Sequence, residues 1–185
     1  MHPSVLLAAL PPTAVDDAAQ DLASALCSQA PRLRRLVHRL LGMGASSHEL
    51  DDLVQDVLLR AWRARASFRG DAALSTWLCR IATTTTASHV RRRALTRRLF
   101  GWLLPDVAAP APATSHHDAH DDSGTLQTAL ARLRHDDREV LVLRYLENRA
   151  IPELAFLLGI SRAAVDARLT RARSRLRALL PETER

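Results

Sequence analysis

The sequence predicts an all-α protein made of two small helical domains joined by a flexible linker. Aromatic residues make up 4% of the 185 residues and only 6 are glycine. The cores must therefore consist mainly of Leu, Ala and Val, and Leu and Ala are strong helix formers. Apolar residues recur at helical spacing in several stretches. A segment rich in Pro, Ala, Ser and acidic residues, 99–124, separates these stretches into two groups.

The charge distribution follows the same division. All 26 basic residues are arginines, which codon bias in a GC-rich genome would also explain. The first domain, 21–98, holds 14 arginines and 6 acids, and the second, 125–185, holds 12 arginines and 8 acids. The loose N-terminal tail, 1–20, and the linker, 99–124, are both net acidic. Two basic blocks with an acidic connector indicate a polyanion bound at two places.

Three helices are expected in the first domain. Residues 21–41 have a helical pattern, which Pro31 is expected to interrupt or restart because proline cannot donate a backbone hydrogen bond. Ser46 or Ser47 can cap the second helix, with acidic residues near its positive N-terminal end.

The second helix, expected to end near Ser67, has an unusual outer face. Its apolar residues step by three and four, which is typical of a helix packed on a core. They are Leu50, Leu53, Val54, Val57, Leu58, Ala61 and Trp62. The opposite face is acidic with Leu59 near its edge, although the protein as a whole is basic.

Residues 68–74 are expected to form a loop, and 76–93 a third helix that Ser75 or Thr76 begins. This helix contains four consecutive threonines, 83–86. Threonine is β-branched and a poor helix former in isolation, so tertiary contacts must stabilise this segment.

The second domain is expected to contain four helices, over 126–134, 137–148, 152–159 and 162–180. Ala155, Gly159 and Val165 have the spacing of a helix-turn-helix: a small residue where the helices cross, a glycine in the turn and an apolar residue that locks the second helix. Ser161 can cap that second helix. Arginines line one flank of it: Arg162, Arg168, Arg171 and Arg175.

Other classes of protein lack support in the sequence. Cys27 and Cys79 belong to no CxxC motif and are expected to be buried free thiols. The His and Asp residues within 116–122 are interpreted as a solvated linker, and we expect no metal and no cofactor. With no phosphate-binding glycine loop, nucleophile elbow or paired carboxylates, an enzyme is not expected. The N-terminus has no convincing signal peptide and no apolar run approaches a membrane span, so a cytoplasmic protein is expected.

The order and spacing of these motifs resemble the extracytoplasmic-function (ECF) RNA polymerase sigma factors of the sigma-70 family. The resemblance covers residues 21–98 and 125–180 and rests on DDLVQDVLLRAWRARASFRG, TWLCRIA, ALARLRHDDREVLVLRYLEN and RLTRARSRLRALL. It implies a sigma factor whose region 2 binds RNA polymerase core and reads and melts the promoter −10 element. Region 4 would read the −35 element, and the acidic linker would thread toward the active-site cleft and RNA-exit channel.

The resemblance also implies partners and site residues. The acidic face of the second helix would bind the β′ clamp helices of RNA polymerase core, promoter DNA would bind both domains, and an anti-sigma factor is expected. The residues implied for core binding are Asp52, Gln55, Asp56, Leu59 and Arg63. Those implied for the −10 element are Phe68, Trp77, Arg80, Thr84, Ser88, Arg91 and Arg92, with Arg93, Arg97 and Arg98 following phosphate. Those implied for the −35 element are Arg162, Asp166, Ala167, Arg168, Thr170 and Arg171.

The sequence departs from its relatives at both DNA readers. Thr84 and Ser88 stand where relatives often have Asn and then Asp or Asn. Asp166 and Ala167 replace a basic residue and a serine. A carboxylate repels phosphate but can accept a hydrogen bond from a cytosine amino group. Asp166 is therefore expected either to read a cytosine or to pair with Arg162 or another nearby arginine.

Two other functions remain open on the sequence alone. One is a stand-alone helix-turn-helix regulator that binds duplex DNA without the polymerase. The other is a degenerate sigma-like protein that sequesters core or a regulator by protein contact. Binding to core polymerase would separate the first from a sigma factor, and promoter-dependent transcription would separate the second.

Overall fold

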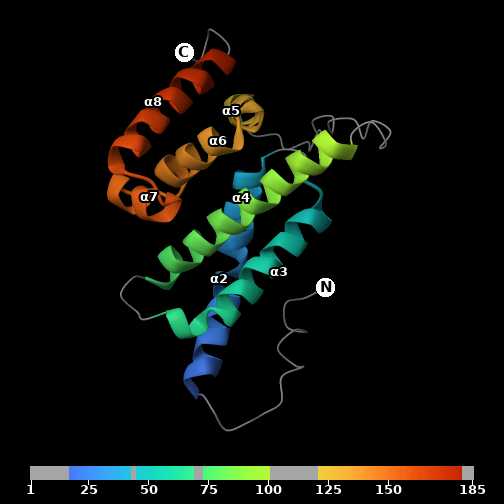
Figure 1. Ribbon diagram of the computed structural model, residues 1–185, viewed down its shortest axis with the longest axis vertical. Helices are drawn as coiled ribbons and strands as arrows, with labels where there is room; N and C mark the ends of the chain where they lie inside the picture. Colours follow the sequence, from blue (N-terminus) through green and yellow to red (C-terminus); the bar gives the residue numbers. More distant parts are fainter. Residues whose placement is uncertain (1–16, 43–44, 69–72, 101–120, 181–185) are drawn as a thin grey trace.

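The regular elements of the structure, a computed structural model, are all helices over the residues that it describes, 17–42, 45–68, 73–100 and 121–180. The first group of helices is α2 (Asp17–Leu41), α3 (Ser47–Arg63) and α4 (Leu74–Phe100). The second group is α5 (Asp121–Arg132), α6 (His135–Leu141), α7 (Ile151–Leu158) and α8 (Arg162–Leu179). Figure 1 shows α2, α3 and α4 side by side, with the second group against one end of them. The predicted all-α fold with two helical domains is confirmed.

Helix α2 runs through Pro31 without a break, so the predicted interruption was wrong. Pro31 is exposed, and the opposite face of the helix is firmly packed. Leu33, Leu36 and Leu40 are at most 3% exposed, and this burial outweighs the one hydrogen bond that a proline removes. The helix also begins at Asp17, inside the stretch expected to be a loose tail.

Helix α3 follows the expected pattern closely. The Ser46 hydroxyl oxygen accepts a hydrogen bond from the backbone N–H of Glu49 at 3.1 Å, which makes Ser46 the N-cap. The apolar stripe faces the core, and Val57 and Ala61 are fully buried. The helix ends at Arg63, and a single 3₁₀ turn, η1 (Arg65–Ser67), brings the segment to the expected end at Ser67.

Helix α4 extends from Leu74 to Phe100, well beyond the expected end at Arg93. Thr83, Thr85 and Thr86 are buried, because α4 packs against both α2 and α3. The threonines therefore have the tertiary contacts that they need. The last turns carry exposed apolar side chains, Leu95, Leu99 and Phe100, which are 52–56% exposed.

The second domain contains the expected helix-turn-helix, formed by α7 and α8. Gly159 ends α7 in the left-handed conformation at φ +65°, which glycine adopts without strain. The Ser161 hydroxyl oxygen accepts from the backbone N–H of Ala164 at 3.2 Å and caps α8. The helices before the helix-turn-helix differ from the prediction in two ways. Helix α5 begins at Asp121, inside the expected linker, and α6 continues as a π-helical segment, η2 (Val142–Leu146).

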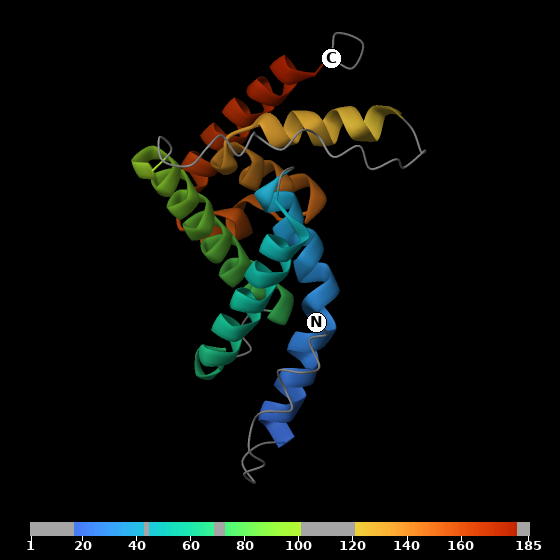
Figure 2. The ribbon, with the colours of Figure 1, turned by 90° about the vertical axis from the view of Figure 1, so that its right-hand side faces the viewer.

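The two domains pack against each other through α2 and α4 on one side and α6 and α7 on the other. Leu36, Val37 and Leu40 of α2 belong to the same buried cluster as Val140 and Leu143 of the second domain. Figure 2, turned by a quarter from Figure 1, shows the second domain still in contact with α2 and α4. The sequence did not predict how the domains sit, and the structure places them in one compact arrangement.

Candidate functional site

The outer face of α3 presents the acidic strip to solvent. Asp52 is exposed, and Asp56 and Leu59 are half-buried. Each carboxylate has a partner one turn away: Asp52 pairs with His48 at 2.9 Å, and Asp56 pairs with Arg60 at 3.0 Å. The remaining members of the predicted core-binding set are the half-buried Gln55 and the exposed Arg63.

Leu59 has a different environment from its neighbour Leu58. Leu58 and Trp62 pack against the buried cluster, whereas Leu59 is not part of it. The strip therefore combines paired carboxylates with a leucine that the fold itself does not need. Such a surface suits a partner that offers both basic and apolar groups.

One face of α4 collects the predicted −10 residues. Arg80, Thr84, Ser88 and Arg91 follow one another at helical spacing of three and four and are all exposed. The Thr84 hydroxyl donates to the Arg80 carbonyl at 2.9 Å, and the Ser88 hydroxyl donates to the Thr84 carbonyl at 2.8 Å. Because each hydroxyl hydrogen is used within the helix, these oxygens present acceptor lone pairs outward. The exposed Arg92 adjoins this face.

An aromatic pair lies at the start of α4. The Phe68 and Trp77 rings are 5.2 Å apart between centroids and inclined at 44°. Phe68 is half-buried, and Trp77 also packs against the core. The loop expected over 68–74 joins them, but its residues 69–72 lie outside the described part of the chain.

Helix α8 presents the predicted −35 residues on its outer face. Val165 and Leu169 are buried, which fixes the helix against α6 and α7. Asp166 is exposed and forms no ion pair with another residue that the structure describes, so the pairing with Arg162 is not formed. Arg168 is half-buried, and the other members of the predicted set are exposed: Arg162, Ala167, Thr170 and Arg171. Arg175, on the same flank, forms an ion pair with the buried Asp137.

Comparison with known proteins assigns both domains. Residues 26–96 match the family Sigma-70 region 2, and residues 123–176 match Sigma-70, region 4. NccH of Alcaligenes xylosoxydans xylosoxydans, an RNA polymerase sigma factor, is 32% identical over 82% of this chain and 83% of its own length. SigG of Mycobacterium tuberculosis, an ECF RNA polymerase sigma factor, is 37% identical over 82% of this chain. The chain belongs to the ECF sigma factors. It spans about half of SigG, 47% of that protein's length.

Solved structures of other sigma factors have the same fold. The sigma factor RpoE from Bartonella quintana, in complex with the anti-sigma factor NepR, matches with a TM-score of 0.67 and 27% identity, over 86% of this chain and 96% of that one. CnrH, in complex with the cytosolic domain of CnrY, matches with a TM-score of 0.57 and 27% identity, over 87% and 93% of the two chains. The first domain is therefore sigma region 2, and the second is region 4.

Region 2 contains a contact that the sequence did not reveal. The Glu49 carboxylate accepts hydrogen bonds from His89 Nε2 at 2.7 Å and from Arg93 Nη1 at 2.8 Å. This clasp joins the start of α3 to α4 and turns Arg93 away from the exposed face that holds Arg91. Arg93, which was expected to follow phosphate, instead binds Glu49 within the fold. Residues 44 positions apart give no local pattern that would predict such a pair.

Glu139 and His135 are among the titratable side chains that region 4 buries and that sequence reasoning also missed. Burial, followed by the nearby Asp136 carboxylate, raises the pKa of Glu139 to about 7. Burial, followed by the nearby Arg138 guanidinium, lowers the pKa of His135. The two side chains approach at 3.8 Å, too far for a hydrogen bond. The His135 Nε2 atom has no hydrogen-bond partner among the described residues.

The remaining expectations concern thiols, metals and membranes. Cys79 is buried, and burial raises the pKa of its thiol to about 11. Cys27 is only half-buried, which corrects the expectation that both thiols are buried. No group of three or more potential ligands gathers among the described residues, and the His and Asp residues of 116–120 lie outside them. In the same part of the chain, no helix is long and apolar enough to span a membrane.

Proposed function

We propose that this protein is a sigma factor that binds RNA polymerase core and directs promoter-specific initiation. Region 2 would read and melt the −10 element, and region 4 would read the −35 element. The main support is that region 2 carries two separate surfaces: an acidic, leucine-bearing strip on α3 and an arginine-bearing face on α4. One domain thus offers separate surfaces for a basic protein partner and for a polyanion.

Core binding would use the outer face of α3. Coiled clamp helices with basic and apolar groups would pair with Asp52 and Asp56 and cover Leu59. The Asp52 and Asp56 side chains are 64% and 40% exposed, so their present partners, His48 and Arg60, exchange at little cost. Gln55 and Arg63 lie on the same surface and would add hydrogen bonds at its rim.

The −10 element would bind the exposed face of α4. Melted bases are held in nucleic-acid-binding proteins by stacking and by a cationic track for the backbone. Arg80, Arg91 and Arg92 would follow the phosphates, and the Phe68–Trp77 pair would form an apolar wall. Thr84 and Ser88 would accept hydrogen bonds from exocyclic amino groups, since their own hydrogens are already used.

The −35 element would bind the N-terminal half of α8. Arg162, Arg168 and Arg171 would contact phosphates or guanine edges. Asp166 has no internal partner in the described part of the chain, which favours the base-reading role over the arginine pair. Because its carboxylate only accepts hydrogen bonds, cytosine would be the preferred base. Ala167 and Thr170, which are uncharged, would add close contacts to the DNA that contribute little binding energy.

An anti-sigma partner would fit a groove between the domains. The groove has a volume of about 640 Å³ and is lined by α2 on one side and by α5 and η2 on the other. Arg34, Arg35 and His38 form a basic wall, and Leu126 and Leu146, 40% and 45% exposed, form an apolar one. An amphipathic segment with acidic residues on one face would match both walls. Of the relatives of known structure, RpoE was solved with the anti-sigma factor NepR, and CnrH with the cytosolic domain of CnrY.

The proposed function is tested first by core binding. Fluorescence anisotropy of the labelled full-length chain, titrated with purified core polymerase, should give saturable binding that a β′ clamp-helix fragment competes away. A stand-alone DNA-binding regulator would show no binding to core. A sequestering protein would bind core but give no promoter-dependent transcripts.

A further inference from the structure

The last turns of α4 project beyond the rest of region 2. Every residue from 94 to 100 is exposed, and Figure 1 shows this end of α4 running past the start of α3. Two of these residues are leucines: Leu95 and Leu99 are 55% and 56% exposed. Because they are one helical turn apart, their side chains are neighbours on one side of the helix.

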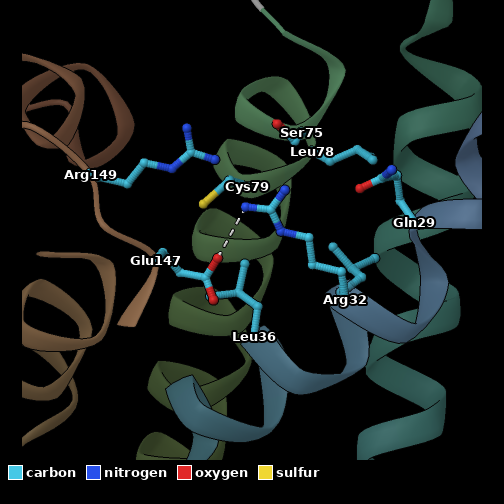
Figure 3. Close-up of a pocket in the computed structure, with 9 residues that line it drawn as sticks. Gln29, Arg32, Leu36, Ser75, Leu78, Cys79, Glu147 and Arg149 are labelled. Carbon is cyan, nitrogen blue, oxygen red and sulfur yellow. Dashed lines mark hydrogen bonds and ion pairs between the residues drawn. The ribbon is translucent and has the colours of Figure 1, made fainter. Parts of the chain in front are cut away.

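Contacts at the start of α4 fix which side of the helix faces inward. Figure 3 shows Ser75 and Cys79 of α4 beside Arg32 of α2 and beside Glu147. The Glu147 carboxylate accepts from Arg32 at 3.4 Å and from Arg39 at 3.2 Å. The pocket between α4 and these partners holds only about 10 Å³, no more than one water molecule needs. Rotation of α4 about its axis would therefore disrupt close packing.

The clasp on Glu49 holds the same side of α4 near its other end. Arg93, which donates to Glu49 at 2.8 Å, comes about five full turns after Ser75, so the two side chains lie on one side of the helix. At about 100° per residue, Leu95 lies about 160° around the helix from Arg93, and Leu99 lies about 120° from it. The leucines are therefore on the side of α4 that faces away from α3.

The leucines continue the exposed face that is proposed to bind the −10 element. Leu95 comes one helical turn after Arg91, and Leu99 one turn after Leu95, which repeats the spacing of the residues before them. One face thus runs along α4 with every member exposed: Arg80, Thr84, Ser88, Arg91, Leu95 and Leu99. Its middle offers hydroxyl oxygens as acceptors, and its last turns offer apolar side chains. A partner that lies along this face therefore meets different chemistry at its two ends.

Arginines flank the leucines on both sides. Arg92 and Arg98, both exposed, lie about 60° from Leu95 in opposite directions around the helix. The whole of α4 contains six arginines and no acidic residue. Cations on both sides of an apolar strip are complementary to a polyanion with an apolar centre. Duplex DNA is such a partner, because its major groove holds thymine methyl groups between two rows of phosphates.

A membrane surface fits this end of α4 less well. Helices that lie in the lipid interface have a large apolar face with the charged residues on the opposite face. Here the third exposed apolar side chain, Phe100, lies about 140° around the helix from Leu95. The apolar strip is therefore narrow and bordered by cations, which matches a groove better than the surface of a bilayer.

The duplex in question lies upstream of the −10 element. Transcription starts downstream of this element, so the template must be single-stranded from there to the start site, and duplex remains on the upstream side. The Phe68–Trp77 pair, proposed as a wall for melted bases, lies at the start of α4. Helix α4 has 27 residues, so it is about 40 Å long, which is the length of about twelve base pairs. Its far end therefore lies beyond the melted bases and at the duplex.

We propose that the end of α4 enters the major groove just upstream of the −10 element and reads thymines there through Leu95 and Leu99. Arg92 and Arg98 contact the phosphates on the two sides of the groove. This inference rests on the proposed function and adds a third sequence-dependent contact, in the spacer between the two elements. The contact needs no hydrogen bond, because a leucine recognises thymine by packing on its C5 methyl group.

Promoter selection with holoenzyme made from core polymerase and the full-length chain tests the contact. The library carries the −10 and −35 motifs of the transcripts that the protein directs, with all positions between them randomised. Wild type should select thymine, on either strand, at about two neighbouring positions beside the −10 motif. Leu95→Ala combined with Leu99→Ala should remove this preference and keep the helix, because alanine is a strong helix former. Phe100→Ala, at an exposed apolar residue on another side of the same helix end, should retain the preference.

Removal of the methyl group alone gives a sharper measurement. In a selected promoter, deoxyuridine replaces each preferred thymine, which deletes the C5 methyl and keeps base pairing. With wild type, the holoenzyme concentration for half-maximal run-off transcription should rise about fourfold per methyl. With the double leucine variant, the thymine and uracil promoters should need the same concentration. This non-additivity would assign the effect to the leucines rather than to a change in the DNA alone.

The outcomes separate this inference from the proposed function. Random bases beside the −10 motif with wild type would overturn the inference, as would a thymine preference that the double leucine variant retains. In either case, binding of wild type to phosphatidylglycerol vesicles that depends on the two leucines would assign the surface to lipid. Absence of any promoter-dependent transcript with wild type would instead overturn the proposed function, and the inference with it.

Discussion

The Arg138 Nε atom lies 3.0 Å from the carbonyl oxygen of Leu40, so a side chain of region 4 caps the end of a helix in region 2. Its Nη2 atom also donates to the Leu41 carbonyl at 2.8 Å. The last carbonyls of a helix lack partners within the helix, and a cation there is favoured by the helix dipole. Burial lowers the pKa of Arg138, and these carbonyls compensate for the lost hydration.

Gly42 makes this contact possible, and its substitution tests it. A Cβ atom at Gly42 would lie 2.7 Å from Arg138 Nη1, whereas one at Gly159 would meet no atom within 4 Å. Both glycines have positive φ, +77° and +65°, so alanine is strained at each by about 1 kcal/mol. Gly42→Ala should destabilise the protein by about 3 kcal/mol and Gly159→Ala by about 1 kcal/mol, because only the first displaces Arg138 and its hydrogen bonds. Urea denaturation measures both, and equal losses would show that the Arg138 contact contributes little.

The buried Glu139 should make stability depend on pH. Its pKa is raised from about 4.5 to about 7 in the folded protein. Its contribution is therefore fully present below the unfolded value and is lost as the pH rises through the folded one. Glu139→Gln should stabilise the protein by roughly 1–3 kcal/mol at about pH 8 and change little at about pH 5. Thermal denaturation of both proteins at each pH provides the test.

His135 also titrates, but wild type and Glu139→Gln both contain it. When the two proteins are compared at the same pH, its effect on stability cancels to first order. The pKa of His135 is lowered, so its contribution is present above the unfolded value and is lost as the pH falls through the folded one. An equal gain from Glu139→Gln at both pH values would contradict the assigned protonation of Glu139.

Substitutions at Leu58 and Leu59 should have different effects, the first on the stability of the fold and the second on polymerase binding. Leu58 packs against the buried cluster, whereas Leu59 does not belong to it. Leu58→Ala should lower the free energy of unfolding by about 2 kcal/mol. Leu59→Ala should leave stability nearly unchanged but weaken core binding by about tenfold, as expected for an apolar contact at the centre of an interface. If Leu59→Ala binds core as wild type does, the α3 face is not the docking surface.

Asp166 should determine part of the −35 preference. Asp166→Lys should change the preferred base at one position of the upstream motif, with a discrimination of about 1–3 kcal/mol. Arg171→Ala should instead weaken binding to all sequences in a similar way, as expected for a phosphate contact. Selection of promoter sequences from a randomised library with each holoenzyme measures both effects. An unchanged motif for Asp166→Lys would exclude the base-reading role.

The sequence predicted those features that depend on local patterns. The Ser46 cap, the α3 stripe and the turn at Gly159 each follow from a few neighbouring residues. The break expected at Pro31 was wrong, because packing of α2 against other helices outweighs local propensity. The end expected at Arg93 was also wrong: α4 continues to Phe100 through exposed residues that are mostly the helix formers Ala, Leu and Arg. Contacts between distant residues left no local pattern to read.

The site shows the same division. The exposed faces of α3, α4 and α8 were predictable from helical spacing together with the family resemblance. Three contacts join residues that are far apart in the sequence. Glu49 and Arg93 are 44 positions apart, and Arg138 and Leu40 are 98 apart. Glu147 is 115 positions from Arg32 and 108 from Arg39. Sequence alone therefore assigned Arg93 to a phosphate track, whereas the fold uses it to hold α3 against α4.

The central claim is that this protein directs RNA polymerase to promoters, and sequencing the 5′ ends of run-off transcripts tests it most directly. Purified core polymerase and fragmented genomic DNA would be incubated with and without the full-length chain. We expect discrete new starts that share two upstream motifs, near −10 and −35, and that disappear when core binding is blocked. Stable core binding without new starts would contradict this account and favour a protein that sequesters the polymerase.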